Sequence, residues 1–104
     1  TAGDWTLDVE GNIAIRVSGM ADWRHEAAIA VHELVEALLC KRDGVTTDQV
    51  DRFDDGFGGE GEPGDDHDAP YARQHCFSTA VERMLIAALE VPWGEYEKAV
   101  EGLK

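Results

Sequence analysis

Residues 27 to 40 read AAIAVHELVEALLC, an apolar run that is interrupted by His32, Glu33 and Glu36. In a helix of roughly 100° per residue, His32 and Glu36 lie about 40° apart on one face, and Glu33 lies about 60° beyond Glu36. An ionised carboxylate without a partner costs several kcal/mol to bury, a large part of a domain's total stability. Each acid therefore needs water, a basic group or a metal ion.

Capping and turn signals divide the rest of the chain. Asp22 is a helix N-cap, and Gly44 follows the basic pair Lys41 and Arg42 as a C-terminal signal. The pattern predicts an α+β fold in one domain over residues 1–104, with the two long helices antiparallel. Its expected elements are a hairpin of 5–8 and 13–17, a central helix over 22–42, a short helix after Thr46, an acidic Gly-rich loop over 54–68, a long helix from 68–70 to Pro92, and a last short helix over 93–103.

Helical spacing and residue type predict which side chains are buried. In the second long helix the expected buried stripe comprises Phe77, Ala80, Val81, Met84, Leu85 and Ala88. Cys40 and Cys76 are expected to be small buried residues rather than ligands or a disulfide. Trp5, Trp23 and Trp93 are expected to seal the edges of the core. His25 is expected at the surface, too far along the helix axis to share an ion with Glu36.

The composition is strongly acidic, with 22 Asp and Glu, nine Lys and Arg, and a net charge of −13. This charge disfavours nucleic acid and anionic membranes as partners. Two cysteines without C-x-x-C spacing favour a reduced compartment. There is no apolar run of about 20 residues and no signal-peptide pattern, so a cytoplasmic protein without a membrane span is expected.

A divalent cation can satisfy His32 and Glu36 together, because side chains four apart on a helix reach one ion with little strain. His75, in the first half of the second long helix, is the predicted third ligand. Two histidines and one carboxylate with an open position are typical of catalytic zinc, so Zn²⁺ or another divalent transition metal is the expected cofactor. Glu33 would then be the general base.

The segment HELVE resembles the zincin metallopeptidase motif H-E-x-x-H, with Glu36 in the place of the second histidine. The resemblance implies zinc binding by His32 and Glu36, activation of water by Glu33, and a peptide or protein substrate. The N-terminal hairpin also suits a zincin-like minimal domain, in which a strand beside the active-site helix pairs with substrate.

A longer pattern is similar to small uncharacterised proteins of bacteriophages and prophages. It covers most of the chain and comprises GDW, IRVS, DWR, AVHELVEALLC, VDxFD, EPGDD, APYxxQH and ER. This resemblance implies a phage-encoded protein in a host cell and carries no activity with it.

Several alternatives stay open at the level of sequence. His32 and Glu36 could form a hydrogen-bonded polar pair with Arg83 as counter-ion, or hold a metal that only stabilises the fold. The acidic surface could bind a basic partner or mimic DNA, and the chain could be a structural or assembly protein. His67 is a weaker candidate ligand. Glu82 could accept a hydrogen bond from a ligand or form a salt bridge with neighbours of Arg83, and the salt bridge is preferred. The loop over 54–68 is expected to be solvated rather than a calcium site.

Overall fold

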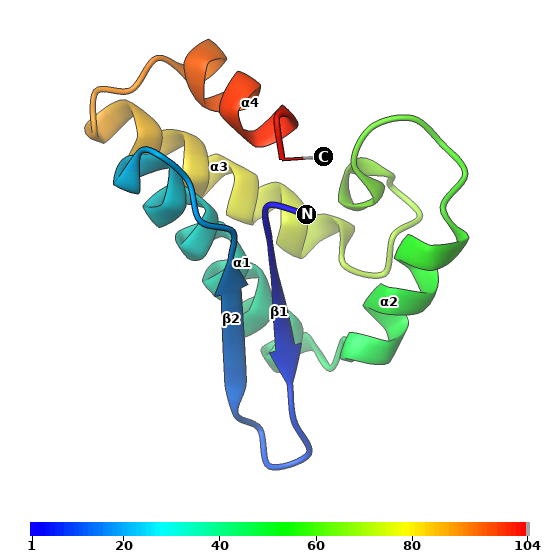
Figure 1. The fold of residues 1–104 in the computed structure, drawn as a ribbon. Coiled ribbons are helices and arrows are strands. Elements are labelled where there is room, and N and C mark those ends of the chain that lie inside the picture. Colours follow the sequence, from blue (N-terminus) through cyan, green and yellow to red (C-terminus); the bar gives the residue numbers. More distant parts are fainter. Residues whose placement is uncertain (104) are drawn as a thin grey trace.

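The computed structural model describes residues 1–103 and has an N-terminal hairpin followed by four α-helices (Figure 1). The α+β class is confirmed. The elements are β1 (Gly3–Leu7), β2 (Ile13–Val17), α1 (Trp23–Asp43), α2 (Thr47–Gly56), the 3₁₀ turn η1 (Pro63–Asp65), α3 (Ala72–Ala88) and α4 (Trp93–Glu101).

The two strands pair antiparallel, with Trp5 opposite Ile15 at the centre. Their connection turns at Gly11, whose φ of 88° is readily adopted by glycine. The Asp8 carboxylate accepts the backbone N–H of Asn12 at 2.9 Å and so closes the turn. The hairpin lies against α1, with Trp5 buried at the contact.

Helices α1 and α3 lie side by side and antiparallel, as the sequence predicts (Figure 1). Three contacts fix their alignment: Arg24 with the Leu89 carbonyl, His32 with Glu82, and Gln74 with Asp43. Asp22 caps α1 by accepting the Arg24 N–H, and Gly44 ends it in the left-handed conformation, both as expected.

Two separate apolar clusters make up the core, and a polar layer lies between them. One contains Trp5, Ala37, Cys40, Ala69 and Tyr71, and the other contains Ala28, Ile29, Ile86, Val91 and Tyr96. Between them along α1 and α3 lie the buried polar side chains of His32, Glu36, Gln74 and Ser78. The middle of the interface between α1 and α3 is therefore occupied by polar side chains.

The acidic segment is more ordered than the predicted loop over 54–68. Thr46 and Gln49 form the predicted capping box, but α2 continues to Gly56 and η1 forms within the segment. The Tyr71 hydroxyl donates to the Asp54 carboxylate, which ties α2 to the start of α3. Helix α3 also begins later than predicted, at Ala72, and ends at Ala88 rather than at Pro92.

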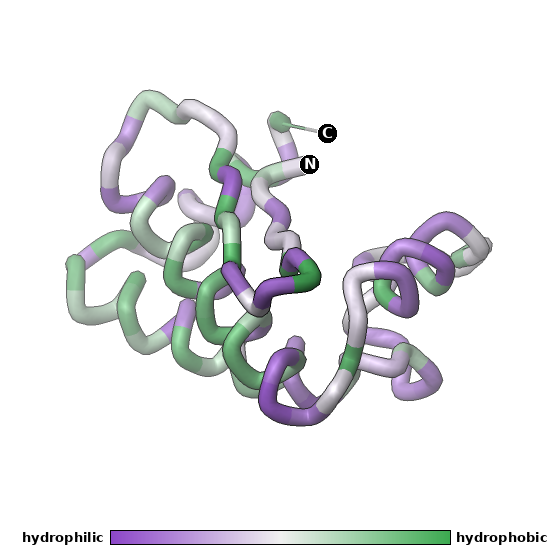
Figure 2. The backbone as a smooth tube through the Cα atoms, turned by 90° about the horizontal axis from the view of Figure 1, so that it is seen from below, coloured by the Kyte–Doolittle hydropathy of each residue, from purple (hydrophilic) through white to green (hydrophobic). Residues whose placement is uncertain are grey.

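The buried stripe predicted for α3 is wrong. Phe77 is 58% exposed and Met84 is 64% exposed, whereas Gln74, Ser78 and Ile86 are buried. Trp23 is likewise 65% exposed and does not seal the core. Figure 2, in which the backbone is coloured by residue hydropathy, shows many hydrophobic residues along the long helices and mainly hydrophilic residues in the acidic segment. No helix within residues 1–103 has the length and apolar character needed to cross a membrane.

Gly3 allows β1 to approach α1 closely. A Cβ atom built there would lie 2.7 Å from Ile29 Cγ2 and 2.9 Å from the Arg16 carbonyl oxygen. We expect Gly3→Ala to lower the free energy of unfolding by about 1–3 kcal/mol through overpacking. Gly19→Ala is the matched control, because a Cβ atom at Gly19 meets nothing within 4 Å. Urea denaturation of both variants checks this, and equal stabilities would contradict the close packing.

Candidate metal site

The structure brings together the three ligands predicted from the sequence. Glu36 Oε2 lies 3.2 Å from His32 Nε2 and 3.0 Å from His75 Nδ1. Four ligands bonded to zinc at about 2.0–2.1 Å in a tetrahedron lie about 3.3 Å from one another. These two distances are close to the edge length of a tetrahedral site, and all three candidate ligand atoms lie within 4.8 Å of one another. The three residues form a group that could hold a metal ion.

Each candidate ligand is also held from behind by a second polar group. His32 Nδ1 lies 2.8 Å from Glu82 Oε1, and His75 Nε2 lies 3.1 Å from Asp65 Oδ1. The other oxygen of Glu36 accepts the Trp5 indole N–H at 3.0 Å. Carboxylates behind ligating histidines are typical of metal centres, because they fix the ring orientation and raise the basicity of the ligand.

Glu82 is itself held in place, because its carboxylate accepts a hydrogen bond from the hydroxyl group of Tyr96 on α4. Tyr96 is buried, and burial together with this hydrogen bond raises the pKa of its hydroxyl. Glu82 pairs with His32 itself, so the structure favours its role as an acceptor behind a ligand over the preferred salt bridge with neighbours of Arg83. The chain from Tyr96 through Glu82 to His32 makes α4 part of the support of the site.

Charge balance in the cluster depends on Glu36. Burial raises the pKa of Glu36, but hydrogen bonds from His32, His75 and Trp5 outweigh burial and lower the pKa to about 2. Burial lowers the pKa of His32, but its bonds to Glu36 and Glu82 raise that pKa to about 10. Burial also opposes the charged form of His75, whose pKa is raised by Glu36. Without a metal, protonated histidines compensate the buried carboxylate, and a bound cation would replace their protons.

Glu33 stands apart from this network. Among residues 1–103 its carboxylate has no hydrogen-bond partner, and its Cγ would lie 3.2 Å from a Cβ atom built on Gly3. Burial raises the pKa of Glu33 to about 7, and the positive charge of His32 opposes the rise. The side chain is neither a fully exposed flank residue nor a member of the hydrogen-bonded cluster.

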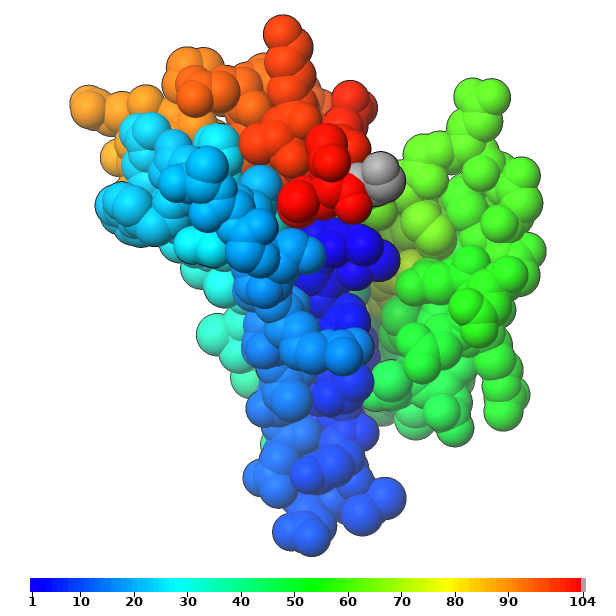
Figure 3. Space-filling view, in the orientation of Figure 1, coloured from blue at the N-terminus to red at the C-terminus, as the bar shows by residue number. Residues whose placement is uncertain are grey.

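A groove runs beside the site, between β1 and the segment that contains α2 and η1 (Figure 3). Trp5 from β1 and Asp65 from η1 each contact a candidate ligand, so the cluster lies between the two walls. Hydrogen bonds at both ends of the hairpin involve even-numbered residues: Ser18 N donates to Ala2 O, and Asp8 N donates to Asn12 O. Backbone groups alternate in direction along an antiparallel strand, so the even-numbered residues of β1 bond to β2 and the odd-numbered ones point away from it. The backbone groups of Gly3 and Trp5 therefore face the groove.

Other residues that the sequence singled out lie away from the cluster. His67 is 94% exposed in its side chain, between Asp66 and Asp68. Arg83 is not a counter-ion of the site but lies over the Trp93 ring at 4.3 Å. Cys40 is buried as predicted, whereas Cys76 is exposed, so that prediction is wrong for Cys76. Sequence reasoning missed Trp5 and Asp65 as neighbours of the ligands.

His25 is buried, which corrects its assignment to the surface. Its Nε2 atom has no hydrogen-bond partner among residues 1–103 and lies 3.8 Å from Asp22 Oδ2. Asp22, His25 and Glu95 form a second group with metal-ligand atoms and border a surface hollow. A cation is disfavoured there, because Asp22 already pairs with Arg24 and because the N-terminus of α1 carries a positive dipole.

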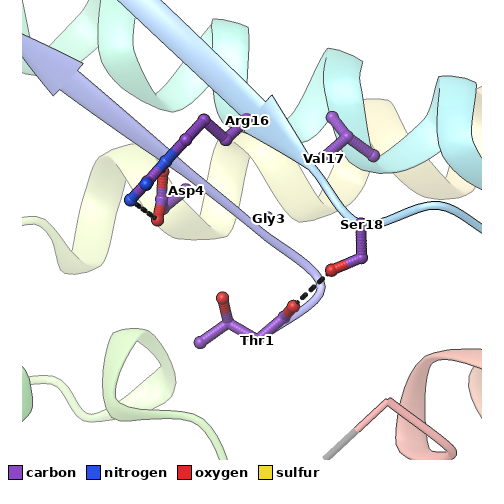
Figure 4. Close-up of a pocket in the computed structure, with 6 residues that line it drawn as sticks. All are labelled: Thr1, Gly3, Asp4, Arg16, Val17 and Ser18. Atoms are coloured by element: carbon purple, nitrogen blue, oxygen red, sulfur yellow. Dashed lines mark hydrogen bonds and ion pairs between the residues drawn. The ribbon is translucent and has the colours of Figure 1, made fainter.

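A second hollow lies at the open end of the hairpin (Figure 4). It is lined by Thr1, Gly3, Asp4, Arg16, Val17 and Ser18. Its polar groups pair with one another: Arg16 donates to Asp4 at 2.6 Å, and the Ser18 hydroxyl donates to the Thr1 carbonyl at 2.7 Å. Neither of these two hollows contains a candidate ligand of the His32 cluster.

Comparison of the chain with protein-family models, curated proteins and solved structures finds no match in any of the three. The site must therefore be interpreted from its own geometry.

Removing the charge of Glu82 tests the support of His32. We expect Glu82→Gln to weaken Zn²⁺ binding about 10–100-fold, because the amide is a poorer acceptor for the imidazole N–H. Glu97→Gln is the matched control, since Glu97 lies exposed on α4. Titration against a competing chelator measures both affinities, and equal affinities would contradict the role of Glu82.

Gly64 fixes the position of the His75 ring. A Cβ atom built at Gly64 would lie 2.6 Å from both Cγ and Nδ1 of His75. Gly64→Ala must therefore displace a candidate ligand atom, and we expect zinc affinity to fall about tenfold or more, as when the surroundings of a ligand are disturbed. Gly58→Ala, where a Cβ atom meets nothing within 4 Å, should bind zinc like the wild type. Zinc titration of both variants compares them, and normal affinity in Gly64→Ala would count against His75 as a ligand.

Proposed function

We propose that this protein is a zinc-dependent hydrolase of the zincin-like type, with His32, Glu36 and His75 as ligands and Glu33 as general base. Peptides are the proposed substrate class. The proposed origin in a phage or prophage, and with it a host cell, depends on the sequence resemblance alone. The proposed location in the cytoplasm is supported by the two cysteines, which are both free.

One observation carries the proposal: three candidate ligand atoms lie within 4.8 Å of one another, and each candidate ligand has its remaining polar atom held by another group. Both ring nitrogens of each histidine are partnered, as a ligating imidazole requires and as a protonated one also does. The basic groups that contact Glu36 are two imidazoles rather than Lys or Arg side chains. Imidazoles can exchange their protons for a metal ion. A zinc ion held there would polarise a substrate carbonyl and lower the pKa of water.

Two features of Glu33 support its proposed role as general base. It adjoins the ligand His32 in the chain and is directed toward β1, where it borders Gly3. Its carboxylate is not committed to a hydrogen bond within residues 1–103, so it can accept a proton from water beside the cluster. Glu36, by contrast, is occupied by three N–H donors.

The preference for peptides follows from the free edge of β1. An extended peptide in the groove can pair with the outward backbone groups of Gly3 and Trp5, as an added strand does. Leu7, the next outward residue, already donates its N–H to Thr47 Oγ1 at 3.2 Å, so α2 limits the length of edge that is open to a substrate. Such pairing would lay a peptide bond near Glu33.

A metal site that only stabilises the fold is the second candidate. It is favoured by the number of elements that the cluster joins, because β1, α1, η1, α3 and α4 all contribute a contacting side chain. In that case a chelator would lower the melting temperature while no peptide would be cleaved.

Glu33→Gln separates the two candidates. We expect the variant to bind zinc as the wild type does and to lose about 10²–10⁴-fold in the cleavage rate of a fluorogenic peptide library, because the amide cannot accept a proton. Glu97→Gln is the control for charge. Metal content by elemental analysis and peptide cleavage are the measurements. Undiminished cleavage by Glu33→Gln would refute the catalytic role, and the absence of cleavage by the zinc-loaded wild type would favour the stabilising site.

A further inference from the structure

The helix pair α1 and α3 carries an exposed apolar surface on the side away from the site. Four large side chains define this outer face: Leu34 and Leu38 from α1 and Phe77 and Met84 from α3 are 43%, 50%, 58% and 64% exposed. The contacts that align the helices place Leu38 at the level of Phe77. Soluble monomers rarely expose a contiguous apolar surface of this kind without a use for it.

The outer face exists because both helices are turned with their polar side chains inward. On α3 the apolar stripe that helical spacing predicts to be buried includes Phe77 and Met84, yet it is the polar row of Gln74, Ser78 and Glu82 that faces α1. The sequence thus encodes an amphipathic helix whose apolar side has no cover within residues 1–103.

Among the exposed apolar side chains of the outer face there is little acidic charge, in a chain with a net charge of −13. The acids of α1 and α3 are engaged elsewhere: Glu26 accepts the Met20 N–H, Asp43 pairs with Arg42 and Gln74, Glu36 and Glu82 belong to the cluster, and Glu33 is directed toward β1. It is therefore a surface on which two copies of so acidic a protein can meet without bringing carboxylates together.

The two ends of α3 differ in charge in a way that suits a second copy. Exposed Arg73 lies at its start, and exposed Glu90 lies just after its end. When two copies of α3 pack antiparallel about a two-fold axis near Val81, Arg73 of each copy approaches Glu90 of the other. The same axis places Phe77 of each copy against Met84 of the other. An interface of this isologous type is self-complementary.

We propose that the outer face binds a second copy of this chain, so that α1 and α3 of two molecules pack into an antiparallel four-helix dimer. The metal clusters of the two copies lie on the far sides of their helices from this interface. The dimer therefore leaves both grooves open and does not depend on the function proposed above.

Sedimentation equilibrium of the full chain from about 1 to 100 μM tests the dimer. We expect the wild type to be dimeric in this range and Phe77→Glu to weaken association by about a hundredfold or more, because each interface would gain two buried carboxylates. Val9→Glu is the matched control, since Val9 is fully exposed at the hairpin tip, outside the outer face. An unchanged circular dichroism spectrum and thermal unfolding in Phe77→Glu show that the variant still folds.

Charge exchange tests the arrangement of the two copies. We expect Arg73→Glu and Glu90→Arg each to weaken the dimer about fivefold or more, and the double variant to regain most of the wild-type affinity. A monomeric wild type at 100 μM, or a Phe77→Glu variant that associates normally, overturns the proposal. Failure of the double variant to recover overturns the two-fold arrangement, as does binding of a different protein at this face in place of the second copy.

Discussion

The buried carboxylate of Glu36 is the constraint on which the rest of this structure depends. Its two oxygens accept N–H groups from β1, α1 and α3, through Trp5, His32 and His75. A buried carboxylate with fewer donors would cost several kcal/mol, so the hairpin and both long helices must be positioned around it. The same convergence brings two imidazoles to one oxygen, so that three groups able to bind a divalent cation lie within 4.8 Å of one another.

Meeting that constraint determines how the helices are turned. Since the inner sides of α1 and α3 hold the polar layer, each of the two apolar clusters is small and lies at one end of the interface. Apolar side chains such as Leu38 and Phe77 are left on the outer face. A protein of this size gains little stability from so divided a core, and both a bound metal and a second subunit would add to it.

The sequence predicts the helices and strands well, and it predicts that His32 and Glu36 share a helix face, because both depend on local spacing. The capping signals of Asp22 and Thr46 lie where the helices begin, and the i, i+4 spacing of His32 and Glu36 fixes their common face. His75 was identifiable as a polar residue on the facing helix. The neighbours that complete the site could not be deduced in the same way, because Trp5 and Asp65 reach it through tertiary contacts between distant segments.

Burial was the part of the fold that the sequence predicted least well. The stripe of Phe77 and Met84 is apolar, and the rule that apolar faces point inward assigns it to the core. The rule fails here because hydrogen-bonded polar side chains occupy the inner face of the helix pair. His25 illustrates the same point: it lies about 20° around the helix from His32, so the face that buries one histidine buries the other. Glu82 follows His75 by seven residues, and this spacing likewise places two side chains on the same face of a helix.

The most direct test of the metal site is a crystal structure of the zinc-loaded protein with anomalous diffraction recorded at the zinc absorption edge. The account predicts an anomalous peak at about 2.0–2.1 Å from His32 Nε2, His75 Nδ1 and Glu36 Oε2. A protein that binds zinc only at surface carboxylates, with the hydrogen bonds of these three side chains intact, would contradict it.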